Sequence, residues 1–315
     1  RRDEADRGAV IDGILTGTIL FSVHLLLQGL DIGDKVRVGG LMGQANQAAS
    51  FVAAYTPVLV SVAAASSVLK MAALLGGLLV CGVAELQTVS RGGLIGLAVG
   101  VVVAASLSGR RSLKAVTWSV ALLLLLSPAV LPDKVFSRFQ GRDMKGNDNR
   151  EAAVSSETRR EIWDAAMAMG LANPLGVGLG QFPSRVAEYG GPAGRDAHSV
   201  YLLVWAEMGW GGLFVFLGLV FQLSRRGLRG LRTGRDLVSR TAGLALVGGM
   251  ASLVTTNLFS ATVRNGSVFG YAWILAAIIA RTTTESGRRS DAHQAADPHH
   301  PVGLPDDVGR IGYSS

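Results

Sequence analysis

Three places in this 315-residue chain carry side chains suited to phosphate and proton chemistry: Arg91, the pair Arg159 and Arg160, and His198. A guanidinium group keeps its charge at physiological pH and binds phosphate oxygens through paired hydrogen bonds. His198 lies near the first turn of a predicted helix, where the helix dipole weakens the hold of an imidazole on its proton, so a neutral His198 is suited to act as a general base. These groups predict a site that stabilises an anionic leaving group and moves a proton.

Each of these residues also has a simpler interpretation. Arg91 lies in a link so short that two helices must turn there, and an arginine at a helix boundary can reach lipid headgroup phosphates. The flanking Gly92 and Gly93 permit close approach of a ligand to the backbone, which favours a ligand site. His198 can equally be a hydrogen-bonded residue at the boundary of a helix.

The elements that must position these side chains are membrane-spanning helices. A span needs about 20 mostly apolar residues to cross a hydrocarbon core of about 30 Å, and within lipid a helix satisfies its own backbone hydrogen bonds. The mean hydropathy of +0.36 is modest because a polar insertion and a polar tail dilute the apolar segments. We predict an all-α, polytopic transmembrane helix bundle of about eight spans, near 10–30, 48–69, 71–88, 92–109, 115–132, 199–223, 241–259 and 267–281.

The spans divide the chain into four regions. One of these regions, the long polar insertion, carries one more predicted helix. Residues 157–170 place Trp163, Met167 and Gly170 on one helical face, which predicts an amphipathic helix resting on the membrane or on the bundle. The regions are an N-terminal bundle of five spans (1–132), an extracytoplasmic loop with short amphipathic helices (133–197), a C-terminal bundle of three spans (198–281) and a disordered cytoplasmic tail (282–315).

Lysine and arginine in the short links predict the orientation of the bundle. The links 109–114 and 224–240 are rich in basic residues, which places them in the cytoplasm. Counting spans from these links puts Lys70 and Arg281 on the same side and Arg91 and His198 on the other. The formal net charge of +7 needs no nucleic-acid partner, because the inner links face anionic lipid headgroups.

Four segments resemble, in order and spacing, the signature blocks of the O-antigen ligase and O-antigen polymerase superfamily. Two departures are visible: the usual Asn-Pro-Asn of the first block is Gln44-Ala45-Asn46, and the residue after the histidine, often Asn, is Ser199. Family members usually have more spans, and the chain lacks an initiator Met, so we expect it to be the later part of a longer protein. The four segments are RVGGLMGQANQAA (37–49), SRGGL (90–94), RREIWDAA with NPLGVGLGQF (159–166 and 173–182) and AHSVYLLVWAEMGWGG (197–212).

The resemblance implies a bacterial glycosyltransferase of the inner membrane with its active site on the extracytoplasmic face. Such an enzyme takes a glycan from an undecaprenyl-diphosphate carrier and joins it to a lipid or protein acceptor. By motif, the catalytic residues fall on Arg91, Arg159 and His198, with Arg37 and Arg160 added to the residues predicted to bind the donor diphosphate. His198 would accept the proton of the acceptor hydroxyl or orient the donor.

The sequence predicts no metal and no cofactor, because the outer face offers no cluster of acidic residues at metal-ligand spacing. Two arginines can stabilise the departing phosphate in place of a metal ion. An O-antigen polymerase built on the same bundle is the main alternative to a ligase. A transporter is disfavoured, because transporters place ionisable groups near the bilayer midplane and these residues crowd one surface.

Overall fold

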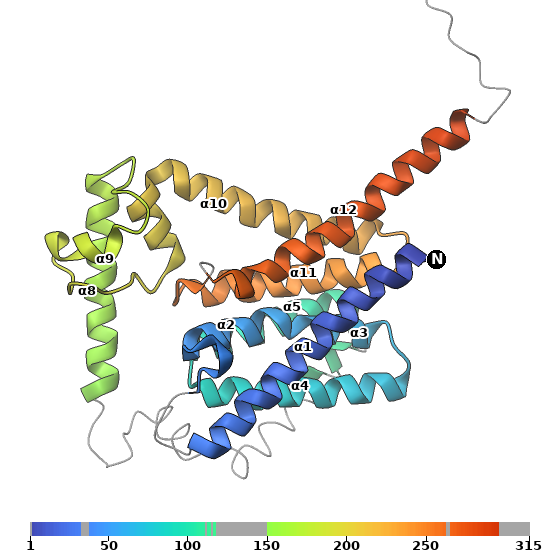
Figure 1. The fold of residues 1–315 in the computed structure, drawn as a ribbon, viewed down its shortest axis with the longest axis horizontal. Coiled ribbons are helices and arrows are strands. Elements are labelled where there is room, and N and C mark those ends of the chain that lie inside the picture. Colours follow the sequence, from blue (N-terminus) through green and yellow to red (C-terminus); the bar gives the residue numbers. More distant parts are fainter. Residues whose placement is uncertain are drawn as a thin grey trace, which may run out of the picture.

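The computed structural model describes residues 2–32, 38–110, 112–114, 116–117, 150–262 and 265–295, and no strand occurs among them. Figure 1 shows most of the helices running side by side as a bundle, with α8 standing across one end. The elements are α1 (Arg2–Ile32), η2 (Gly40–Met42), α2 (Ala45–Tyr55), α3 (Pro57–Ala64), α4 (Val68–Thr88), α5 (Arg91–Ser108), α8 (Arg150–Ala172), α9 (Phe182–Arg185), η3 (Val186–Tyr189), α10 (Val200–Thr233), α11 (Leu237–Thr256) and α12 (Gly266–Ala295).

The described part of the chain contains six helical segments long and apolar enough to cross a membrane. A seventh predicted span coincides with a shorter apolar helix, Gly266–Arg281, while the predicted span 115–132 lies almost entirely outside the described residues. The prediction of an all-α, multi-pass membrane protein is confirmed. The six segments are Glu4–Gly29, Ala45–Ala64, Lys70–Thr88, Arg91–Ser108, Val200–Thr233 and Leu237–Thr256.

Helix α11 occupies the centre of the bundle and packs against α2, α3, α5, α10 and α12. Small residues let it approach α5 closely: a Cβ added at Gly100 would contact the hydroxyl of Ser252 and lie 2.7 Å from the carbonyl oxygen of Gly248. The Ser252 hydroxyl also donates a hydrogen bond to the carbonyl oxygen of Gly96 at 2.9 Å. Small residues and hydroxyls are the usual means of close packing between membrane helices. This contact holds the start of α5 beside the end of α11.

Helix α10 is bent, whereas the sequence predicts one continuous span over 199–223. Gly209 has φ 65° and ψ −165°, a backbone conformation that only glycine adopts without cost. Beyond the bend, the amide of Trp210 donates to the carbonyl oxygen of Pro174 at 3.0 Å. Residues 200–208 therefore leave the bundle and pack beside α8, and only the part after the bend runs back along the other helices (Figure 1).

The predicted amphipathic helix 157–170 is helical and forms part of the longer α8. Its buried face joins α9, η3 and the first part of α10 in a small separate core. Gly170 lies against the ring of Trp205, and Trp163 is half-buried, but Met167 points outward. Helix α8 therefore packs against α9 and η3 of the polar insertion and against α10. The buried members of this core are Ile162, Ala165, Ala166, Met169, Phe182, Val186, Ala197, Leu203 and Ala206.

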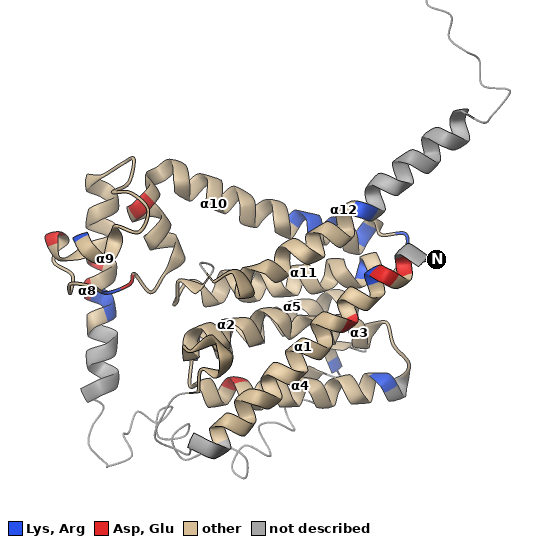
Figure 2. Cartoon of the chain, in the orientation of Figure 1, with Lys and Arg blue, Asp and Glu red and all other residues tan. Residues whose placement is uncertain are grey.

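Basic residues gather at one end of the bundle. Figure 2 shows Lys and Arg on α4, α10 and α12 at the end near the N-terminus, and basic residues of α8 at the opposite end. At the first end, Arg7 of α1 forms an ion pair with Asp236 at 3.3 Å and a hydrogen bond to Ser239 at 3.2 Å, which ties α1 to the start of α11. The side of the membrane that this end faces stays a prediction.

Helix α12 extends further than expected. It continues to Ala295, so residues 282–295 are helical, although the sequence analysis assigned them to a disordered tail. Adding a residue to an existing helix is much easier than starting a helix, and no proline interrupts the chain before Pro298. Residues 296–315 and the boundary at 132–133 lie outside the described residues, so the other divisions of the chain stay predictions.

Candidate active site

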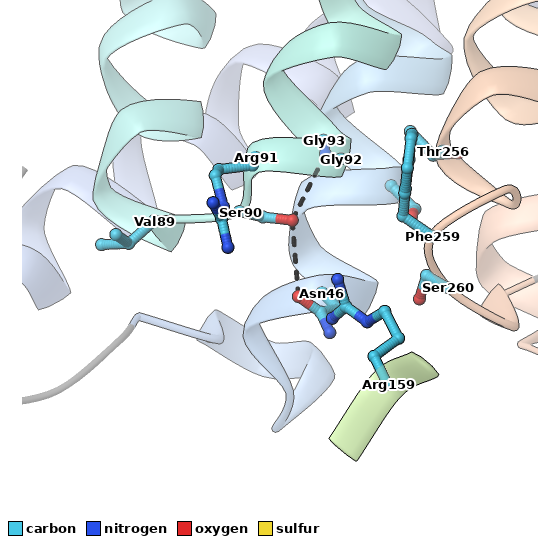
Figure 3. Close-up of a pocket in the computed structure, with 11 residues that line it drawn as sticks. Asn46, Val89, Ser90, Arg91, Gly92, Gly93, Arg159, Thr256, Phe259 and Ser260 are labelled. Carbon is cyan, nitrogen blue, oxygen red and sulfur yellow. Dashed lines mark hydrogen bonds between the residues drawn. The ribbon is translucent and has the colours of Figure 1, made fainter. Parts of the chain in front are cut away.

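The turn between α4 and α5 places Arg91 at the first position of α5. Helix α4 ends at Thr88, and the next residue, Val89, turns the chain with a φ of 52°. Ser90 then caps α5 by accepting a hydrogen bond from the amide of Gly93 at 3.3 Å. The Ser90 hydroxyl also bonds to Oδ1 of Asn46 on α2 at 3.4 Å. Arg91 is exposed and lies beside this pair (Figure 3), so the short link predicted from the sequence presents a guanidinium at the end of the bundle.

Helix α8 supplies Arg159, which extends toward Asn46 and Arg91 (Figure 3). Its side chain is half-buried, and its Nε is fully buried with no hydrogen-bond partner. Burial lowers the pKa of Arg159, and the positive charge of Arg91 lowers it further. A buried N–H donor without an acceptor is costly, and so are two cations near each other. An anion between the two arginines would relieve both costs.

Arg91 and Arg159 line one cavity of about 80 Å³ at this end of the bundle. Its remaining walls come from the end of α11 and the turn after it, from α2 and from the turn before α5 (Figure 3). No aspartate or glutamate is among the lining residues, whose polar groups are hydroxyls and an amide. The lining residues are Asn46, Ser50, Val89, Ser90, Arg91, Gly92, Gly93, Arg159, Thr256, Phe259 and Ser260.

A second cavity of about 350 Å³ adjoins the first and has more apolar walls. It adds Ile95, Arg160 and Trp163 to four residues that also line the first cavity. Arg160, the second predicted arginine of α8, is exposed here and does not line the first cavity. The four shared residues are Arg91, Gly92, Arg159 and Phe259.

The backbone around His198 is fixed from two sides. The carbonyl oxygen of Ala197 accepts a hydrogen bond from the indole Nε1 of Trp163 at 3.1 Å, and the amide of Val200 donates to the carbonyl oxygen of Asn257 at 3.0 Å. Between these anchors His198 has φ 51°, a left-handed conformation that is strained for a residue other than glycine. Such strain persists only where the surroundings enforce it, so His198 is held between α8 and the end of α11.

The imidazole of His198 lies within electrostatic reach of Arg159, although it lines neither cavity. Burial lowers the pKa of His198, the charges of Arg159 and Arg195 lower it further, and Asp196 opposes the shift. An imidazole whose pKa is below about 6.5 is neutral at pH 7. It can therefore accept a proton there.

The structure brings together most of the predicted residues. Arg91 and Arg159 share a cavity, Arg160 borders the adjoining one and His198 lies within electrostatic reach of Arg159, while Arg37 lies outside the described residues. The polar lining of the cavity was not predicted from the sequence. Asn46 and Ser90 stood in signature blocks that could have indicated them, but Ser50, Thr256, Phe259 and Ser260 carried no such signal.

Part of the chain matches a known protein family. Residues 76–217 match the family described as O-Antigen ligase, a range that includes Arg91, Arg159 and His198. This segment is an O-antigen ligase domain. No curated protein matches the chain significantly. The match and the apolar helices support a multi-pass membrane enzyme of the O-antigen ligase or polymerase type, a glycosyltransferase-like class whose substrates are lipid-linked glycans.

The described residues of the O-antigen ligase domain do not form a cluster of metal ligands. Across the described ranges, no group of three or more His, Cys, Asp or Glu side chains gathers as a metal site. The residues that can hold a phosphorylated group are Arg91 and Arg159, with Ser90, Asn46 and Ser260 as further hydrogen-bonding groups. The predicted independence from metals and cofactors stays a prediction.

Proposed function

We propose that this chain transfers a glycan from an undecaprenyl-diphosphate carrier to an acceptor hydroxyl outside the cytoplasm of a bacterium, as an O-antigen ligase of the inner membrane. Arg91 and Arg159 hold the diphosphate, and His198 takes the proton of the acceptor. The cavity would then face the extracytoplasmic side, because the opposite end of the bundle carries the basic links that are typically retained in the cytoplasm.

The observation that carries the proposal is the unpartnered, buried Nε of Arg159 in a cavity shared with Arg91. Like charges near each other are unfavourable unless an anion joins them, and a diphosphate offers several oxygens to two guanidinium groups. Both cations line the cavity before any ligand is bound. They therefore stabilise the negative charge that develops on the leaving diphosphate without reorganisation.

In the proposed reaction, the acceptor hydroxyl oxygen forms a bond to the anomeric carbon of the donor glycan. The bond between that carbon and the diphosphate oxygen breaks, and its electron pair leaves with undecaprenyl diphosphate. His198 accepts the proton of the hydroxyl, for which its lowered pKa keeps it ready at neutral pH. Arg91 and Arg159 bind the departing oxygens and so lower the barrier.

The test is an assay of purified protein in lipid, with a lipid-linked glycan donor and a separate acceptor. The variants Arg91→Ala, Arg159→Ala and His198→Ala should each lose glycan transfer while still inserting and folding. Arg185→Lys is the matched control, because Arg185 is paired with Glu188 at 3.0 Å on α9 and lines neither cavity. Full activity in all three alanine variants would contradict the proposed site.

The same assay separates ligase from polymerase. A ligase places the glycan on the separate acceptor, whereas a polymerase gives a ladder of lengthening lipid-linked chains. The ladder would show that the proposed acceptor is wrong even if the arginines are essential. Cysteine labelling from either side of sealed vesicles at Ala187, an exposed residue of η3, tests the proposed orientation.

A further inference from the structure

Three leucines project from the polar insertion at the end of the bundle that carries α8. Leu171 lies in the last turn of α8 and is 67% exposed, while Leu175 and Leu179 in the following loop are 92% and 71% exposed. An exposed group of large aliphatic side chains is unfavourable in water and usually marks a contact surface. The group of exposed leucines therefore needs a partner that covers it.

The loop that carries these leucines has a defined backbone. Its entry is fixed by Asn173, whose side chain donates to the carbonyl of Met169 and to the hydroxyl of Tyr189, both at 2.8 Å. The buried carboxylate of Glu207 accepts the amide of Phe182 at 3.1 Å at the other end. Backbone hydrogen bonds of 2.9–3.0 Å then join the loop to the bend of α10, from Val177 to Ala206, from Gly178 to Glu207 and from Trp210 to Pro174.

This attachment sets the leucines beside the apolar surface of α10. Beyond the bend, the exposed residues of the spanning helix include Trp210, Phe214 and Phe221, which face outward from the bundle. The rings of Trp210 and Phe214 lie 6.2 Å apart, and Trp210 also contacts Trp205 at 4.8 Å. Tryptophan at the end of a span is typical of the boundary between lipid and water.

We propose that Leu171, Leu175 and Leu179 insert into the lipid leaflet at this end of the bundle and anchor the polar insertion to the membrane surface. The leucine loop continues the surface that α10 presents to lipid, because Pro174 is hydrogen-bonded to Trp210 at the start of the straight part of α10. The hydrogen bonds to α10 already satisfy backbone groups at Pro174, Val177 and Gly178, which lowers the cost of placing this loop in the interface.

The polarity of α8 agrees with this placement. Its exposed residues change along the helix from charged, at Arg160, Glu161 and Asp164, to apolar, at Met167 and Leu171. Only the end of α8 that adjoins α10 therefore contacts lipid. The charged part of the helix, at Arg160, Glu161 and Asp164, stays in water. The anchor fixes the height of α8 and with it the position of Arg159, independently of which glycan the enzyme transfers.

Site-directed spin labelling of the full chain tests the anchor. Cys81, the only cysteine, is replaced by Ala, and a nitroxide is attached at Leu175→Cys or Leu179→Cys in nanodiscs of phosphatidylethanolamine and phosphatidylglycerol that hold one copy each. Phe214→Cys is the lipid-facing reference and Ala187→Cys the water-facing reference. The measurement is the accessibility of each nitroxide to oxygen and to a water-soluble nickel chelate.

We expect labels at 175 and 179 to resemble the label at 214, with high access to oxygen and at least several-fold less access to nickel than the label at 187. Values equal to those at 187 would overturn the proposal. Protection that appears only when discs hold two copies, or only after a partner protein is added, would assign the leucines to a protein contact and would also overturn it. Neither outcome bears on glycan transfer, so the two proposals fail separately.

Discussion

The indole Nε1 of Trp163 donates a hydrogen bond to the carbonyl oxygen of Ala197 at 3.1 Å, directly before His198. Trp163 follows Arg159 by four residues on α8, so both side chains leave the same face of the helix one turn apart. One helical turn therefore presents a cation to the cavity and holds the strained backbone of His198. The relative placement of the arginine and the histidine depends on this hydrogen bond.

Replacing Trp163 by Phe should lower glycan transfer while the protein remains folded. The ring still fills its place, but the hydrogen bond to Ala197 is lost and His198 is less firmly oriented. Misplacement of a catalytic group by about 1 Å can reduce the rate roughly 100-fold, so we expect a loss of about 10-fold to 100-fold in turnover. Trp273→Phe, an exposed position on α12, is the control and should keep full activity. Unchanged turnover in Trp163→Phe would show that the indole hydrogen bond does not contribute to catalysis.

Arg159→Lys should be nearly as damaging as Arg159→Ala. Lysine keeps the positive charge but loses the planar fork and the buried Nε donor, so it cannot bind phosphate oxygens in a paired geometry. Removal of one preorganised donor commonly reduces kcat about 100-fold to 1,000-fold, and we expect a loss of that size. Steady-state kinetics with a lipid-linked donor check the prediction. Wild-type turnover in the lysine variant would mean that only charge matters at this position.

The pH dependence of kcat/KM should show an acid limb set by His198. Because burial and the charge of Arg159 lower the pKa of His198, the limb should lie below about 6.5, the ordinary value for histidine. Asp196 raises this pKa, so Asp196→Asn should move the limb to lower pH while its Oδ1 still accepts the amide of Ala197.

If the limb does not move in Asp196→Asn, the limb belongs to another group. Its complete absence would favour a role for His198 in orienting the donor.

The lowered pKa of His198 also affects folding. Below pH about 6.5 the unfolded chain binds the proton more readily than the folded chain, so the stabilising contribution of neutral His198 is present above that pH and is lost as the pH falls through the folded pKa.

Glu207 should matter for the stability of the polar insertion. Its carboxylate is buried and accepts the amide of Phe182 at 3.1 Å, so Glu207→Leu leaves a buried N–H without an acceptor. Such a group costs about 1–3 kcal/mol, whereas Glu207→Gln keeps an acceptor oxygen and should cost less. Thermal unfolding of both variants in detergent measures the difference. Equal midpoints for the two variants would show that this hydrogen bond does not stabilise the loop.

The spans could be predicted from sequence because the hydrophobicity of a helix and the charge of its flanking links are sums over neighbouring residues. These sums located the helices now called α1, α4, α5 and α11 and grouped the basic links at one end. The first signature block contains Asn46, but nothing in the sequence assigned it to the site. The end of α12 was misjudged because a helix can continue into polar sequence that composition alone assigns to a tail.

The bend of α10 could not be predicted in the same way. Gly209 stands near Gly211 and Gly212, and glycine is common within membrane helices, so its residue type does not reveal a left-handed conformation. That conformation is set by the loop at Pro174, which occupies the position the helix would otherwise take. The difference arises from a contact between segments more than thirty residues apart.

By itself the sequence determined the membrane class, the helical spans, the sidedness of charge and the residue types suited to phosphate chemistry, because each depends on local composition. Only the tertiary structure decided that Arg91 and Arg159 share a cavity, that Phe259 and Ser260 complete its wall and that Trp163 holds the backbone beside His198. These relationships join residues far apart in the chain. Their distances follow from how the helices pack, which no local pattern of residues contains.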